Sequence, residues 1–189
     1  MTRARAALRW LAVGLLCTLS AHGRAQEGGP DAAPEYVLKA GFLFNFAKYV
    51  EWPAGAFASL DAPISIGVVG SDPFGADLER TLRDKTVNNR RFEIRRYAGH
   101  AEVEPVHILF VPQTERERVV RILERVDRMP VLTVGEDEAF PRGGGVVAIL
   151  IRERRARLHI NPEAAEAQHL AIAPKLLRIA TIVTSAGEP

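Results

Sequence analysis

Segment 35–52 carries the residue types whose spacing says most about possible chemistry. It reads EYVLKAGFLFNFAKYVEW, is apolar on nearly every side, and precedes the helix-breaking Pro53. Gly41, Asn45, Lys48 and Trp52 are spaced by four, three and four residues, which places them on one face of a predicted helix. Two interpretations stay open. In the first, Asn45 and Lys48 simply face solvent or form hydrogen bonds with nearby backbone. In the second, this face binds a protein partner and Trp52 is its anchor.

A turn between a predicted strand and a predicted helix is the second candidate site. Residues 67–75, GVVGSDPFG, match neither the dinucleotide-binding glycine pattern nor the phosphate-binding P-loop. Free backbone N–H groups at a helix start still bind anions, and Ser71 and Asp72 would line such a ligand site. The alternative is an ordinary turn in which Asp72 caps the helix and Pro73 takes its first position.

Signatures of catalysis and of metal binding are missing from the sequence. No G-x-S-x-G motif occurs, and no histidine has the helical spacing with a glutamate that marks a zinc site. The histidines beyond the first 25 residues are His100, His107, His159 and His169. We expect them to be packed or surface residues, and we expect no enzyme, no metal and no cofactor.

Arginines gather at two places, a predicted strand and a predicted hairpin. Their members are Arg90, Arg91, Arg95 and Arg96, and Arg152, Arg154, Arg155 and Arg157. Charges at sheet edges commonly prevent edge-to-edge pairing. The alternative is a local basic patch that meets an acidic partner or a membrane surface.

The first 25 residues have the three parts of a secretory signal peptide. Three arginines precede the apolar stretch 10–21, and small and polar residues follow it. The apolar stretch is shorter than the roughly 20 residues that span a bilayer. We expect cleavage after Ala25, with cleavage after Gly23 or an uncleaved anchor helix as alternatives, and we expect a periplasmic protein.

Removal of the leader changes the charge balance. The chain has 25 basic and 23 acidic residues, and four arginines but no acid lie in residues 1–25, so the remainder has 21 basic residues and a formal charge of −2. This balance argues against a nucleic-acid partner, which would favour a strongly basic domain. The single cysteine, Cys17, also lies in the leader, so we expect no disulfide.

Strand and helix patterns alternate along the rest of the chain. Residues 26–34 are expected to be a flexible linker and residues 35–185 a single α/β domain. The predicted strands are 63–70, 90–97, 106–112 and 130–136, with a hairpin over 143–161, and the predicted helices are 71–84, 114–129, one beginning at Asn161-Pro162, and 174–183. Thr114 and Glu117 form a predicted capping box. Alternating elements predict a mixed, mostly parallel sheet sandwiched between helices, with an antiparallel hairpin.

Several of these segments together resemble one family. YVLKAGFLFNFAKYVEWP, ISIGVVGSDPFGADL, VLTVGEDEAF and APKLLRIATIV are similar to motifs of the YfiR/HmsC-like family of periplasmic regulators, and the resemblance covers residues 35–183. It implies a compact α/β fold that often dimerises, and repression of a membrane-bound diguanylate cyclase through that enzyme's periplasmic sensor domain. It also implies lower cyclic-di-GMP, reduced biofilm formation, and sequestration by an outer-membrane lipoprotein.

The resemblance has one departure and transfers no catalytic residues. Better-known members carry cysteine pairs that this chain lacks after its leader, so redox sensing through thiols is not expected here. Two function hypotheses follow. One is a protein-binding repressor of a membrane signalling enzyme. The other is a periplasmic small-ligand binding protein that uses the strand-end crevice near Ser71 and Asp72.

Overall fold

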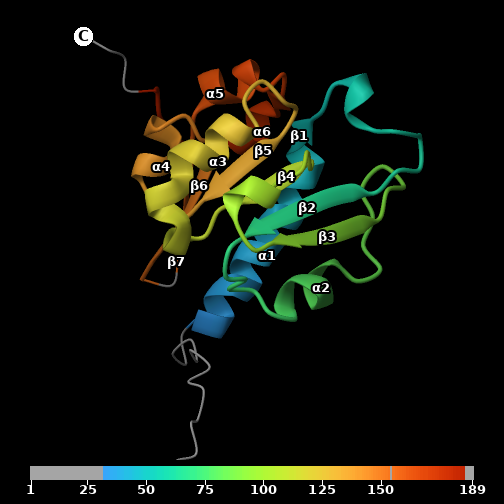
Figure 1. The fold of residues 1–189 in the computed structure, drawn as a ribbon, viewed down its shortest axis with the longest axis horizontal. Helices are drawn as coiled ribbons and strands as arrows, with labels where there is room; N and C mark the ends of the chain where they lie inside the picture. Colours follow the sequence, from blue (N-terminus) through green and yellow to red (C-terminus); the bar gives the residue numbers. More distant parts are fainter. Residues whose placement is uncertain (1–31, 154, 186–189) are drawn as a thin grey trace, which may run out of the picture.

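The computed structural model describes residues 32–153 and 155–185. The predicted leader, residues 1–25, and residues 26–31 of the predicted linker lie outside the described part of the chain. Figure 1 shows the described residues as an α/β unit whose helices lie on both sides of a twisted sheet. The predicted fold class, a single α/β domain with a mostly parallel sheet and an antiparallel hairpin, is confirmed.

Most strands of the structure belong to one sheet. The strands are β1 (Val50–Glu51), β2 (Ile64–Val69), β3 (Phe92–Tyr97), β4 (Ile108–Phe110), β5 (Leu132–Gly135), β6 (Val147–Arg152), β7 (Arg155–Ile160), β8 (Ala171–Ile172) and β9 (Thr181–Ile182). The seven-stranded sheet has the order β3-β2-β4-β5-β6-β7-β9, and β1 pairs only with β8. Strands β2, β3, β4, β5 and β6 run parallel to one another, β7 is antiparallel to β6, and β9 is parallel to β7.

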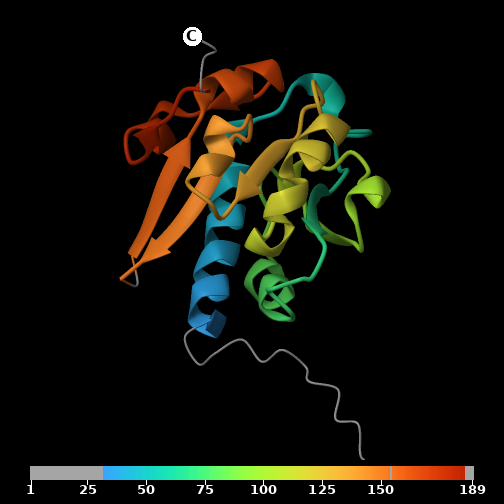
Figure 2. The same ribbon diagram turned by 60° about the vertical axis from the view of Figure 1, so that its left-hand side comes forward.

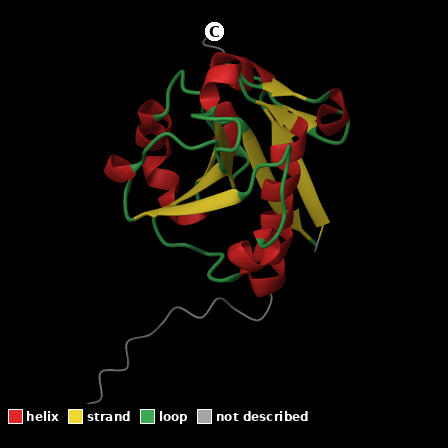
Figure 3. Ribbon diagram, turned by 90° about the vertical axis from the view of Figure 1, so that its right-hand side faces the viewer, coloured by secondary structure: helices red, strands yellow, loops and turns green. Residues whose placement is uncertain are grey.

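The helices pack against both faces of this sheet. They are α1 (Ala32–Tyr49), α2 (Asp77–Leu82), α3 (Val119–Arg125), α4 (Ala139–Arg142), α5 (Pro162–Ala167) and α6 (Pro174–Leu177), with the 3-10 turns η1 (Ala54–Ala56), η2 (His100–Glu102) and η3 (Gln113–Arg118). Figure 3 shows helices on the two sides of the strands. Figure 2 shows α5 and α6 at the end of the molecule opposite the start of α1.

Two hydrophobic cores follow from the alternation of side chains along the strands. Ile66, Ile108 and Leu132 lie in the core that α1 and α2 cover. Val69 and Leu109 point to the opposite face and pack in the core with Ile122 of α3. Because both faces are buried, the central strands are apolar without alternation, as is typical of parallel sheets.

The first helix differs from its prediction at both ends. It begins at Ala32, within the predicted linker, and it ends at Tyr49 instead of Trp52. The Tyr49 carbonyl accepts a bond from the Ala173 N–H at 2.8 Å, and the next residue, Val50, pairs with Ile172. Pairing with a distant segment therefore ends the helix three residues early.

The helix after β2 also begins later than predicted. Asp72 does not cap a helix and Pro73 is not its first residue, because α2 starts at Asp77. The Asp72 carboxylate instead accepts the Phe74 N–H at 2.8 Å, which closes a local turn. Gly75 follows with a φ of 52°, and this left-handed conformation delays the helix.

Two further helix predictions are wrong. Segment 114–129 forms η3 and the short α3 in place of one long helix. The predicted capping box is not made, because η3 begins at Gln113 with Pro112 at its N-cap and Thr114 lies inside the turn. Segment 174–183 forms α6 and then β9, which pairs with β7. The predicted helix start at Asn161 is confirmed, since its side chain accepts the Ala164 N–H at 3.0 Å.

Candidate functional site

The outer face of α1 is the first candidate site. Val37 and Leu38 are 47% and 39% exposed, although most of the remaining apolar residues of this helix are buried or half-buried. They border a groove of about 360 Å³ that is also lined by Gly41, Phe42 and Asn45. A Cβ atom at Gly41 would meet nothing within 4 Å, so the groove is open at this position. Neighbouring exposed apolar side chains of this kind are typical of interaction surfaces.

Two lysines border the apolar face on the side toward α2. The Lys48 ammonium lies 4.4 Å from the centre of the Phe44 ring, and the Lys85 ammonium lies 4.7 Å from the same ring. Asn45 and Lys48 are both exposed, as expected from their shared helix face. An apolar groove with a basic border suits a partner that has apolar and acidic side chains.

Trp52 lies outside this face. Its indole N–H donates to the His107 carbonyl at 3.2 Å, and its ring packs edge-on against Phe57 and His107. The side chain is half-buried, at the end of the sheet where β4 begins. The predicted common face therefore holds Asn45 and Lys48 but not Trp52, because α1 ends first. Partner contact by Trp52 stays a prediction.

Ser71 and Asp72 lie at the carboxyl end of β2. The strand order reverses between β2 and β4, and ligands of open α/β sheets bind at such a switch point. Ser71 is exposed, but the Asp72 carboxylate is committed to the Phe74 N–H and to the Arg96 guanidinium, 2.7 Å away. Anion binding at Ser71 and Asp72 stays a prediction. The helix N-terminus on which this prediction was based is not next to these residues, because α2 starts at Asp77.

A buried ion cluster that was not predicted from the sequence also lies at the carboxyl ends of the central strands, next to β4 and β5. Lys39 is 3% exposed, and its ammonium contacts the carboxylates of Glu35 and Glu136. The second oxygen of Glu136 accepts the Gln113 backbone N–H at 2.7 Å. Burial, followed by the carboxylates of Glu136 and Glu35, raises the pKa of Tyr36 above its ordinary value. The cluster anchors the start of α1 to the ends of β4 and β5.

The position of Lys39 within its helix could have revealed the cluster. Lys39 lies on the same helix face as Ala40, Leu43 and Phe46, all of which are fully buried. A buried ammonium requires a partner, and Glu35 is one helical turn away. The second partner, Glu136, is 97 residues distant in sequence, so only the fold identifies it.

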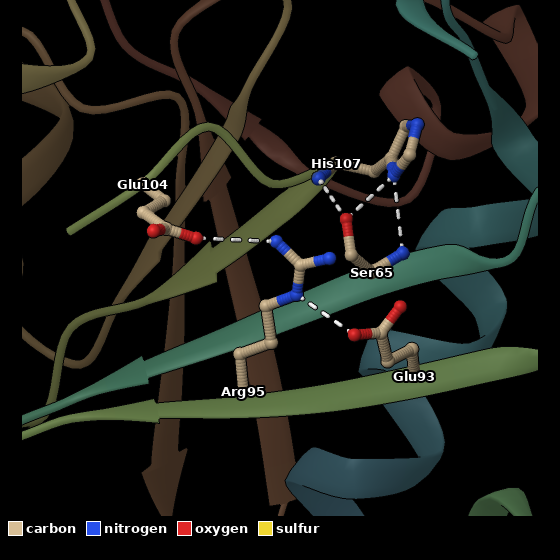
Figure 4. Close-up of polar contacts among 5 residues, drawn as sticks. All are labelled: Ser65, Glu93, Arg95, Glu104 and His107. Carbon is tan, nitrogen blue, oxygen red and sulfur yellow. Dashed lines mark hydrogen bonds and ion pairs between the residues drawn. The ribbon is translucent and has the colours of Figure 1, made fainter. Parts of the chain in front are cut away.

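A serine–histidine pair lies at the opposite end of the strands. Figure 4 shows Nδ1 of His107 bonded to Ser65, and the Ser65 backbone N–H donates to this nitrogen at 3.0 Å. Nδ1 therefore carries no proton, and Nε2 carries it and donates to the Ala56 carbonyl at 3.1 Å. Ser65 is only 5% exposed and its hydroxyl already bonds His107, so the pair stabilises the strand ends and is closed to a substrate.

The described part of the chain holds no cluster of three or more histidine, cysteine, aspartate or glutamate side chains arranged to bind a metal ion. None of its helices is both long enough and apolar enough to cross a membrane.

Comparison with known families decides the relationship of this chain. The model of the YfiR/HmsC-like family matches residues 36–181, most of the sequence. The chain belongs to the YfiR/HmsC-like family. Membership suggests a periplasmic regulator of cyclic-di-GMP signalling, in a family of regulators rather than enzymes. No curated protein matches the chain significantly.

A solved structure is similar to this YfiR/HmsC-like chain at the level of the fold. A conserved domain protein from Vibrio cholerae shares 12% identity at a TM-score of 0.54, over 78% of this chain and 59% of that one. The chain thus spans less than two thirds of that protein. An ABC domain from Streptococcus pneumonia, solved in complex with L-Trp, shares 13% identity over 63% and 55% of the two chains, at a TM-score of 0.47 that supports no argument.

The His107 arrangement predicts how the stability of this YfiR/HmsC-like protein depends on pH. Burial lowers the pKa of His107, the Ala56 bond opposes this shift, and Arg90 and Arg95 add to it. As pH falls below about 6.5, the unfolded chain binds a proton that the folded His107 does not, so the free energy of unfolding decreases until the folded pKa is reached.

Urea unfolding between pH 7 and pH 5 would measure this loss. His107→Gln should show a shallower pH dependence than the wild type, because it lacks the imidazole that takes up the proton on unfolding. His100, His159 and His169 are present in both proteins, so their contribution is the same in each. Identical pH profiles for the two proteins would contradict the role assigned to His107.

Proposed function

We propose that this protein represses a membrane-bound diguanylate cyclase by binding the periplasmic sensor domain of that enzyme through the outer face of α1. Repression lowers cyclic-di-GMP and with it biofilm formation. Membership of the YfiR/HmsC-like family supports the pathway. The proposal includes a periplasmic protein whose leader, residues 1–25, is cleaved, with residues 35–185 as the functional domain.

The exposed apolar groove of α1 is the observation that carries this proposal. Val37 and Leu38 remain exposed on a helix whose opposite side is fully buried. The exposed surface of these two side chains is not used in the core, so a partner that covers it would bury additional apolar surface. Asn45 and Lys48 supply polar contacts at the rim of this groove, where they remain partly hydrated.

The same face offers a mechanism for relieving repression. An outer-membrane lipoprotein that binds the α1 face would compete directly with the sensor domain. A homodimer formed through this face would also remove it from the cyclase, so dimerisation and repression would be mutually exclusive. The proposed repressor thus needs no thiol chemistry and no catalytic step.

Gene deletion tests the proposed function. Deleting the gene should raise cellular cyclic-di-GMP, and restoring the wild-type gene should lower it again. Cyclic-di-GMP is measured in extracts of the parent, deletion and restored strains. If the level is unchanged in a strain that expresses the gene, the repressor proposal fails and small-ligand binding becomes the leading hypothesis.

A further inference from the structure

Strand β3 leaves one edge of the main sheet unpaired among the described residues. It is the last strand in the sheet order and pairs only with β2. The carbonyls of Arg91 and Tyr97 both bond toward β2. Backbone direction alternates along a strand, so the N–H and C=O groups of Phe92 and Ile94 point to the open edge. Figure 1 shows β3 as the outermost strand of the sheet, next to α2.

A basic cleft adjoins this open edge. Its volume is about 610 Å³, and it is lined by Arg83, Lys85 and Arg91 together with the half-buried Phe92 and Ile94. None of the three cations forms an ion pair with any described residue. By contrast, the carboxylate of Glu79, which also lines the cleft, is neutralised by Arg96 at 2.6 Å. Asp84 is the remaining acid, so positive charge predominates in the cleft.

We propose that the cleft and the open edge of β3 together bind an extended acidic segment of a partner protein, which adds to the sheet as a further strand. The backbone of the segment would bond Phe92 and Ile94, while its carboxylates would face Arg83, Lys85 and Arg91. Strand addition obtains affinity from main-chain hydrogen bonds and specificity from side-chain contacts. The cleft lies on α2, β3 and the loop between them and shares Lys85 with the border of the α1 face. The peptide test below does not depend on the identity of the cyclase.

The chemistry of the edge favours this occupant over two others. A compact anion would satisfy the cations but leave the backbone groups of β3 without partners, because these repeat along the strand about every 7 Å. A second copy of this chain, paired through its own β3, would bring a second set of Arg83, Lys85 and Arg91 against the same basic cleft. Like charges placed opposite one another oppose strand pairing, so an acidic strand fits better.

Synthetic peptides provide the test on the whole wild-type protein. The probe is a seven-residue peptide that alternates valine and glutamate, with a valine–lysine peptide as the charge control. Two further peptides carry N-methyl groups, one on every valine and the other on every glutamate. An added strand directs alternate N–H groups toward β3, so only one of the N-methylated peptides should lose binding. Hydrogen exchange at the amides of Phe92 and Ile94 should slow when the unmodified acidic peptide binds.

A protein variant tests the contribution of the cations. Arg83→Gln, Lys85→Gln and Arg91→Gln together should weaken binding of the acidic peptide by about tenfold, from roughly twofold for each exposed ion pair. The matched control is Arg155→Gln with Arg157→Gln, two exposed arginines of β7 without ion pairs in the described structure, and it should bind normally.

Three outcomes would overturn the proposal. The first is equal binding of both N-methylated peptides without protection of the β3 amides, which would indicate charge attraction alone. The second is binding of inorganic phosphate that depends on the three cations while the acidic peptide fails to bind, which would make the cleft a small-anion site. The third is the absence of binding by any probe. Each of these is independent of whether gene deletion raises cyclic-di-GMP.

Discussion

Replacing Lys39 with alanine is expected to lower the free energy of unfolding by about 3–5 kcal/mol. The change removes the ammonium that balances Glu136, whose side chain is only 4% exposed. A buried carboxylate without its cation loses more in desolvation than it regains from the Gln113 N–H. Urea unfolding followed by circular dichroism measures the change.

Two control variants separate charge pairing from general damage to α1. Lys48→Ala, at an exposed lysine of the same helix, should change stability by less than about 0.5 kcal/mol. The double variant Lys39→Met with Glu136→Leu removes both charges, so it should recover most of the stability lost in Lys39→Ala. If Lys39→Ala is as stable as the wild type, the cluster does not anchor the helix.

Replacing Leu38 with aspartate should abolish repression of the cyclase while the protein remains folded. The side chain is 39% exposed and borders the α1 groove, so a charge is tolerated in the free protein but would be buried in the complex. Loss of a central interface contact commonly costs about 2 kcal/mol or more, roughly a 30-fold loss of affinity. The measurement is cyclic-di-GMP in a deletion strain that carries the variant gene.

Val120→Asp is the matched control for this prediction. Val120 is 65% exposed on α3, which packs on the opposite face of the sheet. The control variant adds the same charge at an exposed apolar position and should repress normally. Full repression by folded Leu38→Asp would exclude the α1 groove as the cyclase-binding surface, even if gene deletion raises cyclic-di-GMP.

The surface around α1 could be predicted in part from the sequence. The spacing of Asn45 and Lys48 correctly indicated a shared exposed face, because helix periodicity is a local property. Trp52 was wrongly included because nothing local shows that Val50 pairs with Ile172 and ends the helix. The helix position of Lys39 and the nearby Glu35 were a local signal for a buried pair, but the second partner, Glu136, lies far along the chain and only the fold identifies it.

The sequence by itself determined the class of each central element and the α/β architecture. The continuous apolar strands, the hairpin and the Asn161 cap could be predicted because each depends on residues that lie close together in the sequence. Only the tertiary structure decided where the helices end, that residues 181–182 pair as a strand with β7, and that Lys39 meets Glu136. The physical reason is that these outcomes depend on hydrogen bonds and charge pairs between distant segments, whose energies outweigh local propensity.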